Sequence, residues 1–136
     1  MSAAEVFFDS NVLLYLLSSD EAKADRIETL LQKGGVVSVQ VLNEVAAVAL
    51  RKQALSFGEL QEFLATLREF CRAIPVTVEV HERGLEVAER WRYSLYDSMI
   101  IAAALESGCR TLYSEDLQHK QVIDRRLNVI NPFDTP

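Results

Sequence analysis

The sequence predicts a single α/β domain in which about five parallel strands form a sheet covered by helices on both faces. Short β-branched runs alternate along the chain with longer runs of helical hydrophobic period. Strands separated by helices need crossover connections, which lead to a mostly parallel sheet between two layers of helices. The 136 residues, of which 49% are hydrophobic, suffice for one core, and no linker or repeat divides them. We therefore treat residues 1–136 as one three-layer domain.

Five short runs carry the strand pattern, because they are rich in Val, Ile, Phe and Thr and lie between helical segments. They are residues 5–8, 36–39, 75–78, 111–113 and 128–130. Between the first two, a Ser/Asp cap opens a helix that places Ile27, Leu30 and Leu31 on one face and stops at Gly34 and Gly35.

Two helices are expected after the second strand. The first covers residues 40–53, and the second begins at Ser56 with a capping box to Glu59. The second helix carries an apolar stripe whose helical spacing continues as far as Cys71. Its large members are Phe57, Leu60, Phe63, Leu64, Leu67 and Phe70. Such a stripe fits a core position, and it also fits a docking surface for a second subunit or a partner helix.

Two further helices are expected before the fourth strand. Residues 80–91 form an amphipathic helix with Leu85, Ala88 and Trp91 on a common stripe. The next helix, residues 94–106, is apolar nearly all round, which is typical of a buried helix. Gly108 follows it as a stop signal.

Composition excludes several classes of protein. No stretch approaches the roughly 18 apolar residues of a membrane span, and the N-terminus lacks the basic region of a signal peptide. Cys71 and Cys109 belong to no CxxC pair, so we expect small buried hydrophobes in a reducing cytoplasm. The net charge of −6 is unusual for a protein that binds nucleic acid by bulk electrostatics, so a cation or a basic patch would have to offset it.

Acidic side chains follow two of the predicted strands. Asp9 ends the first strand, and Ser114, Glu115 and Asp116 end the fourth. Because ligands of open α/β sheets bind outside the carboxyl ends of the strands, these side chains are expected at one edge. Asp9 could equally be a helix cap, and Asp116 a turn residue.

Two helices supply further acids. Glu44 lies within the apolar stripe of Val41, Val45 and Val48, and Asp97 lies in the first turn of the buried helix. Taken alone, Glu44 fits an exposed rim, and Asp97 fits a first-turn acid that the helix dipole favours.

Taken together, the acids indicate a metal site. Four carboxylates at one edge repel one another unless a cation lies among them, and Mg²⁺ or Mn²⁺ prefers oxygen ligands. Such a centre suits phosphoryl chemistry, with Asn11 and Ser114 placed to hold a ligand carboxylate or the attacking water. Simple turn chemistry is the alternative for Asn11 and Ser114. No Gly-rich phosphate loop is present, and His81 and His119 fit structural or solvated positions better than catalytic ones.

The same residues resemble the motifs of PIN-domain ribonucleases. DSNVLLYLL, with Asp9 and Asn11, is similar to the opening D-x-N motif, and SVQVLNEVAAVALRK is similar to the second block, with Glu44. SLYDSMIIAAALESGCRTLYSEDLQH resembles the third and fourth blocks, with Asp97, Ser114 and Asp116. The spacing and the trailing NVINPF are most similar to VapC-type toxins of type II toxin–antitoxin pairs.

The resemblance implies a Mg²⁺- or Mn²⁺-dependent endoribonuclease that acts on RNA, forms homodimers and is blocked by an antitoxin protein. Asp9 and Asp97 are the first choices as metal ligands, with Glu44 and Asp116 completing the acidic ring and Glu115 as an extra. Relatives often carry Gly at the position of Lys120, so the loop after Asp116 is expected to differ in shape or in RNA contact.

Two other functions stay open at this point. The site could act on DNA or on a structured RNA outside any toxin role, or the chain could bind RNA or a partner without cutting. Five basic residues of the later segments either ring the acids or are scattered solvated charges. They are Arg90, Arg92, Lys120, Arg125 and Arg126.

Overall fold

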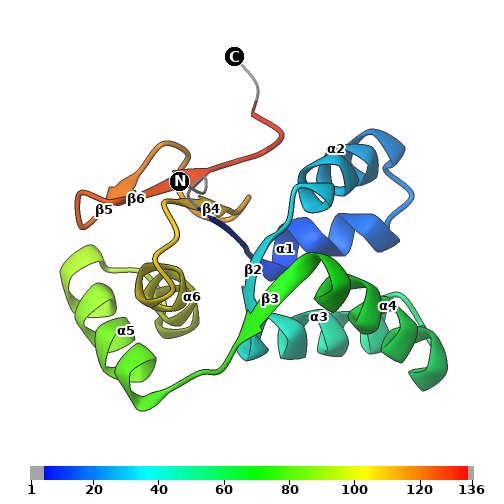
Figure 1. Ribbon diagram of the computed structural model, residues 1–136, viewed down its shortest axis with the longest axis horizontal. Coiled ribbons are helices and arrows are strands. Elements are labelled where there is room, and N and C mark those ends of the chain that lie inside the picture. The colour runs from blue at the N-terminus through cyan, green and yellow to red at the C-terminus, as the bar shows by residue number, and fades with distance from the viewer. Residues whose placement is uncertain (1–4, 135–136) are drawn as a thin grey trace.

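A computed structural model describes residues 5–134 and shows three layers, with a central sheet between two groups of helices (Figure 1). Within these residues the sheet has six strands in the order β3-β2-β1-β4-β6-β5. The strands are β1 Val6–Phe8, β2 Gly35–Ser38, β3 Cys71–Ile74, β4 Thr111–Tyr113, β5 Val122–Ile123 and β6 Leu127–Ile130. Five strands run parallel to one another, namely β3, β2, β1, β4 and β6. The sixth strand, β5, lies at the edge and pairs antiparallel with β6.

The helices cover both faces of the sheet, as the sequence predicts. Figure 1 shows α5 and α6 on one face and the group from α1 to α4 on the other. Their bounds are α1 Ser10–Leu13, α2 Glu21–Gln32, α3 Val39–Lys52, α4 Phe57–Phe70, α5 Val78–Trp91 and α6 Leu95–Glu106, and the 3-10 helix η1 covers Leu14–Leu17. In residues 5–134 no helix is long and apolar enough to cross a membrane.

The third strand is the main error of the sequence interpretation. β3 covers Cys71–Ile74, whereas residues 75–77 of the predicted strand connect it to α5 and Val78 is the first residue of that helix. The chain passes directly from helix to strand at Cys71, whose backbone is already extended with φ −121° and ψ 141°. No Gly or Pro marks this boundary, and Cys71 continues the helical spacing of Leu60 and Leu67, so the hydrophobic period hides it.

The short strand β5 was not predicted. It turns back onto β6 through Asp124 and Arg125, which have positive φ values of 51° and 60°. Gly and Asn usually supply such a turn, so the sequence lacks the usual hairpin signal.

Helix α5 has a different inner face from the one predicted. Val80, Gly84 and Val87 are buried, whereas Leu85 is 47% exposed. A Cβ atom at Gly84 would lie 2.4 Å from the sulfur of Met99, so the absence of a side chain allows α5 to pack closely on α6. The adjacent helix α6 is buried from Ser98 to Leu105, as its apolar sequence predicts.

Candidate active site

Asp9 lies at the carboxyl end of β1 and is only 3% exposed. Its Oδ1 accepts the backbone N–H of Ser10 at 2.7 Å, so Asp9 does cap α1. Its Oδ2 accepts the Ser114 hydroxyl at 2.9 Å and the Asn11 amide at 3.2 Å. Asp9 can therefore cap α1 and also belong to the acidic site. One carboxylate oxygen accepts the N–H of Ser10 in α1, and the other accepts the hydroxyl of Ser114 after β4.

Ser114 and Asn11 join the ends of β1 and β4. Ser114 is fully buried, and its backbone N–H bonds to the carbonyl of Ile130 at 3.1 Å. Asn11 Nδ2 lies 3.3 Å from Ser114 Oγ, and Asn11 Oδ1 accepts the N–H of Glu115 at 3.1 Å. These contacts fix the orientation of the Asp9 carboxylate from two sides.

Glu44 reaches the same edge from α3. Ser10 Oγ donates to its Oε1 at 2.8 Å, and Gln40 Nε2 donates to its Oε2 at 3.2 Å. Gln40 also donates to the carbonyl of Tyr96 in α6 at 3.1 Å, which ties the two helices together across the site. Glu44 is half-buried rather than fully solvated, and both partners are uncharged.

Asp97 and Asp116 complete the group. Asp97 is half-buried in the first turn of α6, below its cap residue Ser94, whereas Asp116 is exposed in the loop after β4. Burial raises the pKa of Asp97, the hydrogen bond with Ser94 lowers it, and the charges of Asp116 and Glu44 raise it further. Glu44 and Asp116 thus lie close enough to Asp97 for their charges to act on it.

The raised pKa of Asp9 shows that its ionised form is unfavourable in this position. Burial raises this pKa from 3.8 to about 6, with the charges of Glu44 and Asp97 adding to the effect. The hydrogen bonds from Ser114 and Ser10 lower it without offsetting the increase. A bound cation would reverse this balance, because an opposite charge close to a carboxylate stabilises its ionised form.

The donor set fits Mg²⁺ or Mn²⁺ in its chemistry, since all of its members offer oxygen and none carries a positive charge. In the described part of the chain, no three Asp, Glu, His or Cys side chains are grouped closely enough to form a ready metal cage. Mg²⁺ is commonly held by one or two carboxylates, with water and substrate phosphate as its other ligands. The residues present are compatible with that mode of binding.

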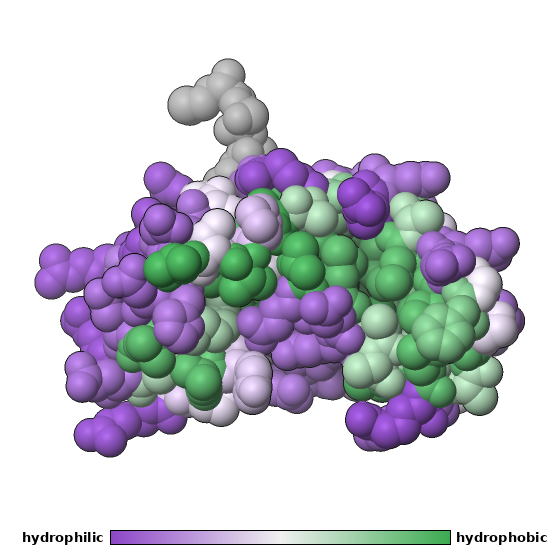
Figure 2. All heavy atoms as spheres, turned by 90° about the horizontal axis from the view of Figure 1, so that it is seen from below, coloured by the Kyte–Doolittle hydropathy of each residue, from purple (hydrophilic) through white to green (hydrophobic). Residues whose placement is uncertain are grey.

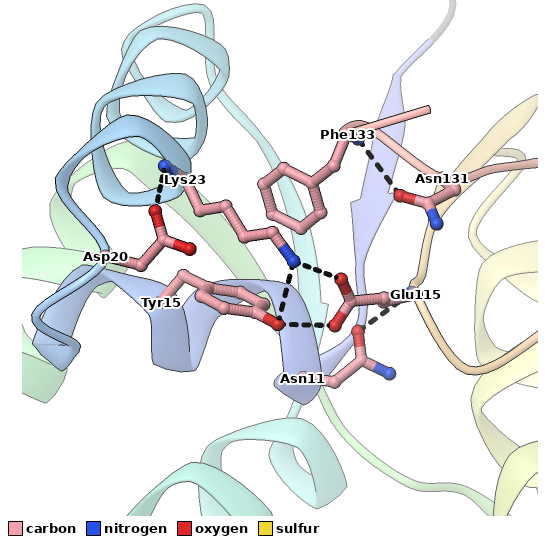
Figure 3. A network of polar contacts seen from close by, with 7 residues as sticks. All are labelled: Asn11, Tyr15, Asp20, Lys23, Glu115, Asn131 and Phe133. Carbon is pink, nitrogen blue, oxygen red and sulfur yellow. Dashed lines mark hydrogen bonds and ion pairs between the residues drawn. The ribbon is translucent and has the colours of Figure 1, made fainter. Parts of the chain in front are cut away.

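Glu115 does not belong to the acidic group. Tyr15 donates its hydroxyl to Glu115 Oε1 at 2.6 Å, and Lys23 Nζ lies 2.9 Å from Oε2 (Figure 3). Burial raises the pKa of Glu115, but the hydrogen bonds from Tyr15 and Lys23 outweigh it and the net shift is downward. The Lys23 ammonium also lies 4.7 Å from the ring centroids of Tyr15 and Phe133. We call Tyr15, Lys23, Glu115 and Phe133 the neutralised cluster.

Three of the five basic residues, for which the sequence left open a ring around the acids or scattered charges, make separate contacts. The guanidinium of Arg126 donates to the carbonyl of Leu105, near the far end of α6 from Asp97. Arg90 stacks on the Trp91 ring at 5.7 Å. Among the five candidates, Lys120 lines a cavity that also contains Arg26 and His119.

The apolar stripe of α4 is divided between core and surface. Leu60 and Leu67 are buried, whereas Phe57 is 71% exposed and Phe70 40% exposed. Figure 2 shows the molecule from below the view of Figure 1, and on this face hydrophobic residues gather in patches that polar residues interrupt. A mainly apolar cavity of about 240 Å³ lies between η1, α2 and α4. Whether a partner covers this face stays a prediction.

Four contributors to this edge were not anticipated from the sequence. Gln40 precedes Glu44 by four residues on one helix, so their contact could have been found from helical spacing. Ser10 lies beside Asp9 in the chain, but its bond to Glu44 spans 34 positions. Tyr15 and Lys23 meet Glu115 across about 90 to 100 positions, for which the sequence gives no local signal.

Solved structures support the fold. The chain is similar to a toxin–antitoxin complex from Klebsiella pneumoniae, with 19% identity, a TM-score of 0.74 and coverage of 96% of this chain and 100% of the other. It is similar to VapC20 of Mycobacterium tuberculosis, described as a sarcin–ricin loop cleaving toxin, with 20% identity, a TM-score of 0.67 and coverage of 82% and 90%. VapBC2 of Rickettsia felis, bound to promoter DNA, gives 17% identity, a TM-score of 0.62 and coverage of 92% and 95%.

No curated protein matches the chain by sequence. A family model described as the PIN domain matches residues 6–124, which include Asp9, Asn11, Glu44, Asp97, Ser114 and Asp116. The match covers most of the chain and agrees with the three-layer fold and the acidic edge of its sheet. The chain belongs to the PIN domain family.

Proposed function

We propose that this protein is a Mg²⁺- or Mn²⁺-dependent endoribonuclease and the toxin of a toxin–antitoxin pair. The observation that carries the proposal is the buried, hydrogen-bonded Asp9, whose pKa is raised to about 6 beside Glu44 and Asp97. A buried carboxylate whose ionised form is unfavourable is stabilised by a bound cation, which supports a metal site here. Mg²⁺ held by carboxylates commonly catalyses the hydrolysis of phosphodiesters. The similarity to VapC20 and to toxin–antitoxin complexes supports RNA as the substrate and an antitoxin as a partner.

The side chains have separate roles in this proposal. Asp9 and Asp97 hold the metal, and Glu44 and Asp116 complete the acidic group. The bound metal supplies Lewis-acid activation of water and stabilises the charge that develops on phosphate. Ser114 and Asn11 keep the Asp9 carboxylate in one orientation through its Oδ2. Ser10 and Gln40 do the same for Glu44 through its two oxygens.

The reaction is hydrolysis of a phosphodiester bond. The oxygen of water attacks phosphorus, the bond from phosphorus to the leaving ribose oxygen breaks, and the proton of the water passes to a carboxylate of the acidic group. The proton later reaches the leaving oxygen through solvent. Uncharged partners around Asp9 and Glu44 leave these carboxylates free of any competing ion pair, which suits both metal binding and proton transfer.

The test is cleavage of total RNA by purified, antitoxin-free protein with Mg²⁺ or Mn²⁺. An EDTA control and the variant Asp97→Asn should each abolish the discrete fragments that the wild-type protein produces. A folded protein that binds metal but leaves RNA intact would contradict the nuclease and favour a binding module. A small reading frame for a DNA-binding protein next to the gene would favour the toxin over a nuclease outside any toxin role.

The proposed assembly has a separate test. We propose a homodimer and an antitoxin-binding surface that includes the exposed part of α4, because Phe57 and Phe70 are large apolar side chains left in water. Phe57→Glu should weaken either the dimer or antitoxin binding, as measured by light scattering and by titration of the purified antitoxin. Unchanged values for both would remove α4 from the interface.

A further inference from the structure

A cavity of about 430 Å³ lies beside the end of β6, outside the acidic group. It is formed by α2, by the loop after β4 and by the segment after β6. Its lining residues are Arg26, His119, Lys120, Ile130, Asn131, Pro132 and Asp134. Three of the lining residues, Arg26, His119 and Lys120, have basic side chains.

The wall of this cavity is held by two hydrogen bonds. The backbone N–H of Asn131 donates to Nδ1 of His119 at 2.9 Å, so Nδ1 is the acceptor and Nε2 carries the ring proton. Arg26 Nε donates to the carbonyl of Pro132 at 3.1 Å, which leaves its terminal nitrogens available for a ligand. The positions of Arg26 and His119 are thus fixed through the backbone of the segment after β6.

The cavity has an excess of positive charge. Within residues 5–134, Lys23, Arg72 and Arg83 each have a carboxylate within 4 Å, whereas none is found for Arg26 or Lys120. One carboxylate is present in the cavity, because Asp134 Oδ2 lies 3.8 Å from His119 Nε2. Arg26 and Lys120 together still outweigh Asp134, in a protein whose net charge is −6.

Lys120 has an unusual backbone. Its φ is +67°, a left-handed conformation that non-glycine residues adopt less readily than glycine. Its N–H donates to the carbonyl of Val129 at 2.7 Å, which holds the loop in this conformation against β6. This backbone contact fixes the place of Lys120 at the cavity.

The cavity is connected to the acidic group through β6. Ser114 bonds to Asp9 through its hydroxyl and to Ile130 through its N–H, and Ile130 and Asn131 line the cavity. Ser114 and Ile130 end neighbouring parallel strands, so the cavity lies at the same edge of the sheet as Asp9. Guanidinium and ammonium groups are the usual partners of phosphate oxygens.

We propose that this cavity binds a backbone phosphate of the RNA strand next to the phosphodiester that is cut. The proposal rests on the proposed nuclease function and adds the site that holds the substrate in register. Because phosphate contacts carry no sequence information, the cavity should act on any single-stranded RNA. It also explains how an acidic protein can attract RNA, since the positive charge is local rather than global.

The first experiment uses the two histidines of the chain as probes. In the Asp97→Asn variant, which should not cut RNA, a random-sequence single-stranded RNA of about 12 nucleotides is added while the ring proton signals of both histidines are followed by NMR. The signals of His119 should shift on titration, whereas those of His81, exposed on α5, should not. Equal shifts of both, or a shift of neither while the RNA is bound, would overturn the proposal.

The second experiment measures affinity by fluorescence anisotropy with the same RNA. Lys120→Gln should weaken binding about two- to fivefold, which is the range of an exposed ion pair. It should also reduce the slope of log Kd against log salt by about 0.7, the value for one lost single-strand phosphate contact. Lys120→Arg should retain affinity, and Asp134→Asn should increase it. Lys52→Gln, an exposed lysine at the end of α3, is the matched control and should change nothing.

The outcomes separate the two proposals. If wild-type protein neither binds nor cuts RNA, the proposed function fails and the phosphate site fails with it. If it cuts RNA and Lys120→Gln behaves as Lys52→Gln does, only the phosphate site is wrong. If Lys120→Gln weakens binding of poly-glutamate but not of RNA, the cavity recognises an acidic protein segment and the proposal is also overturned.

Discussion

Two neighbouring regions of this molecule treat their carboxylates in opposite ways. Within residues 5–134, no ion pair joins Asp9, Glu44 or Asp97 of the acidic group to a basic side chain, and the pKa values of Asp9 and Asp97 are raised. In the neutralised cluster, Glu115 bonds to Tyr15 and Lys23, and its pKa is lowered. Asn11 lies between them, since its amide nitrogen reaches Asp9 and its oxygen accepts from Glu115. The two regions are thus joined through one residue, Asn11, by two hydrogen bonds.

The difference in charge compensation separates carboxylates that we assign to function from one that stabilises the fold. Lys23, which compensates Glu115, contacts the adjacent Tyr15 and Phe133 rings but leaves the charges around Asp9 uncompensated. A protein selected only for stability would gain from a cation beside Asp9, because an unpaired buried carboxylate is costly. We therefore propose that the uncompensated group binds a ligand, whereas the Glu115 side chain joins Tyr15 and Lys23.

The largest expected effect compares one acid from each region. Asp9→Asn should reduce RNA cleavage at least about 10²- to 10³-fold, because a group that acts on the transition state is lost. Glu115→Gln should leave the rate within about threefold, since its partners hold structure rather than substrate. Single-turnover cleavage rates of both purified variants provide the measurement. A comparable loss in Glu115→Gln would place Glu115 in the active site and remove the distinction.

A pH effect follows from Asp9 in metal-free protein. Its folded pKa of about 6 lies above the unfolded value of 3.8, so the folded state binds the proton more tightly. Stability is then greatest below about pH 4 for this group and is lost as pH rises through 6, by roughly 3 kcal/mol in total. Denaturant unfolding in EDTA at pH 4.5 and pH 7 should show this loss.

Two variants sharpen the pH comparison. Asp9→Asn should remove the pH-dependent loss, whereas Glu115→Gln should retain it. Ser114→Ala removes a hydrogen bond that lowers the pKa of Asp9 in the folded state, so the loss of stability should extend to higher pH and become larger. A wild-type protein that becomes more stable between pH 4.5 and pH 7 in EDTA would contradict the pKa assigned to Asp9.

The smallest effect concerns the neutralised cluster. Tyr15→Phe removes the hydroxyl that donates to Glu115 and should cost about 1 kcal/mol of unfolding free energy. The ring contact with Phe133, at 5.0 Å between centroids, remains in this variant. Urea unfolding gives the stability, and RNA cleavage at saturating metal should be unchanged. A cleavage defect without any loss of stability would show that the cluster acts on the chemistry.

The positions of the acids could be predicted because they depend on topology. Asp9 and Ser114 follow strands that the hydrophobic pattern reveals, and parallel strands bring their carboxyl ends to one edge. Glu44 and Asp97 follow from helical periodicity. The charge balance of the edge could not be predicted, because Lys23 reaches Glu115 from 92 positions away through side-chain packing.

The errors in the fold have the same origin. β3 was misplaced because Cys71 extends the helical period of α4 without a breaker residue. The inner face of α5 was misjudged because Gly84, which contacts Met99, does not register as an apolar residue. In each case a tertiary contact decided a boundary or a face that local composition left undetermined.

The most direct test of the distinction between the two regions is thermal unfolding at pH 7, in EDTA and with Mg²⁺ or Mn²⁺. The metal should raise the Tm of wild-type protein and of Glu115→Gln by about 5–10 °C at roughly a hundred times its Kd. Asp97→Asn should have a higher Tm than wild type in EDTA, because one repelling charge is gone, and should lose the response to metal. An equal metal-dependent shift in Asp97→Asn, or none in the wild-type protein, would contradict the account.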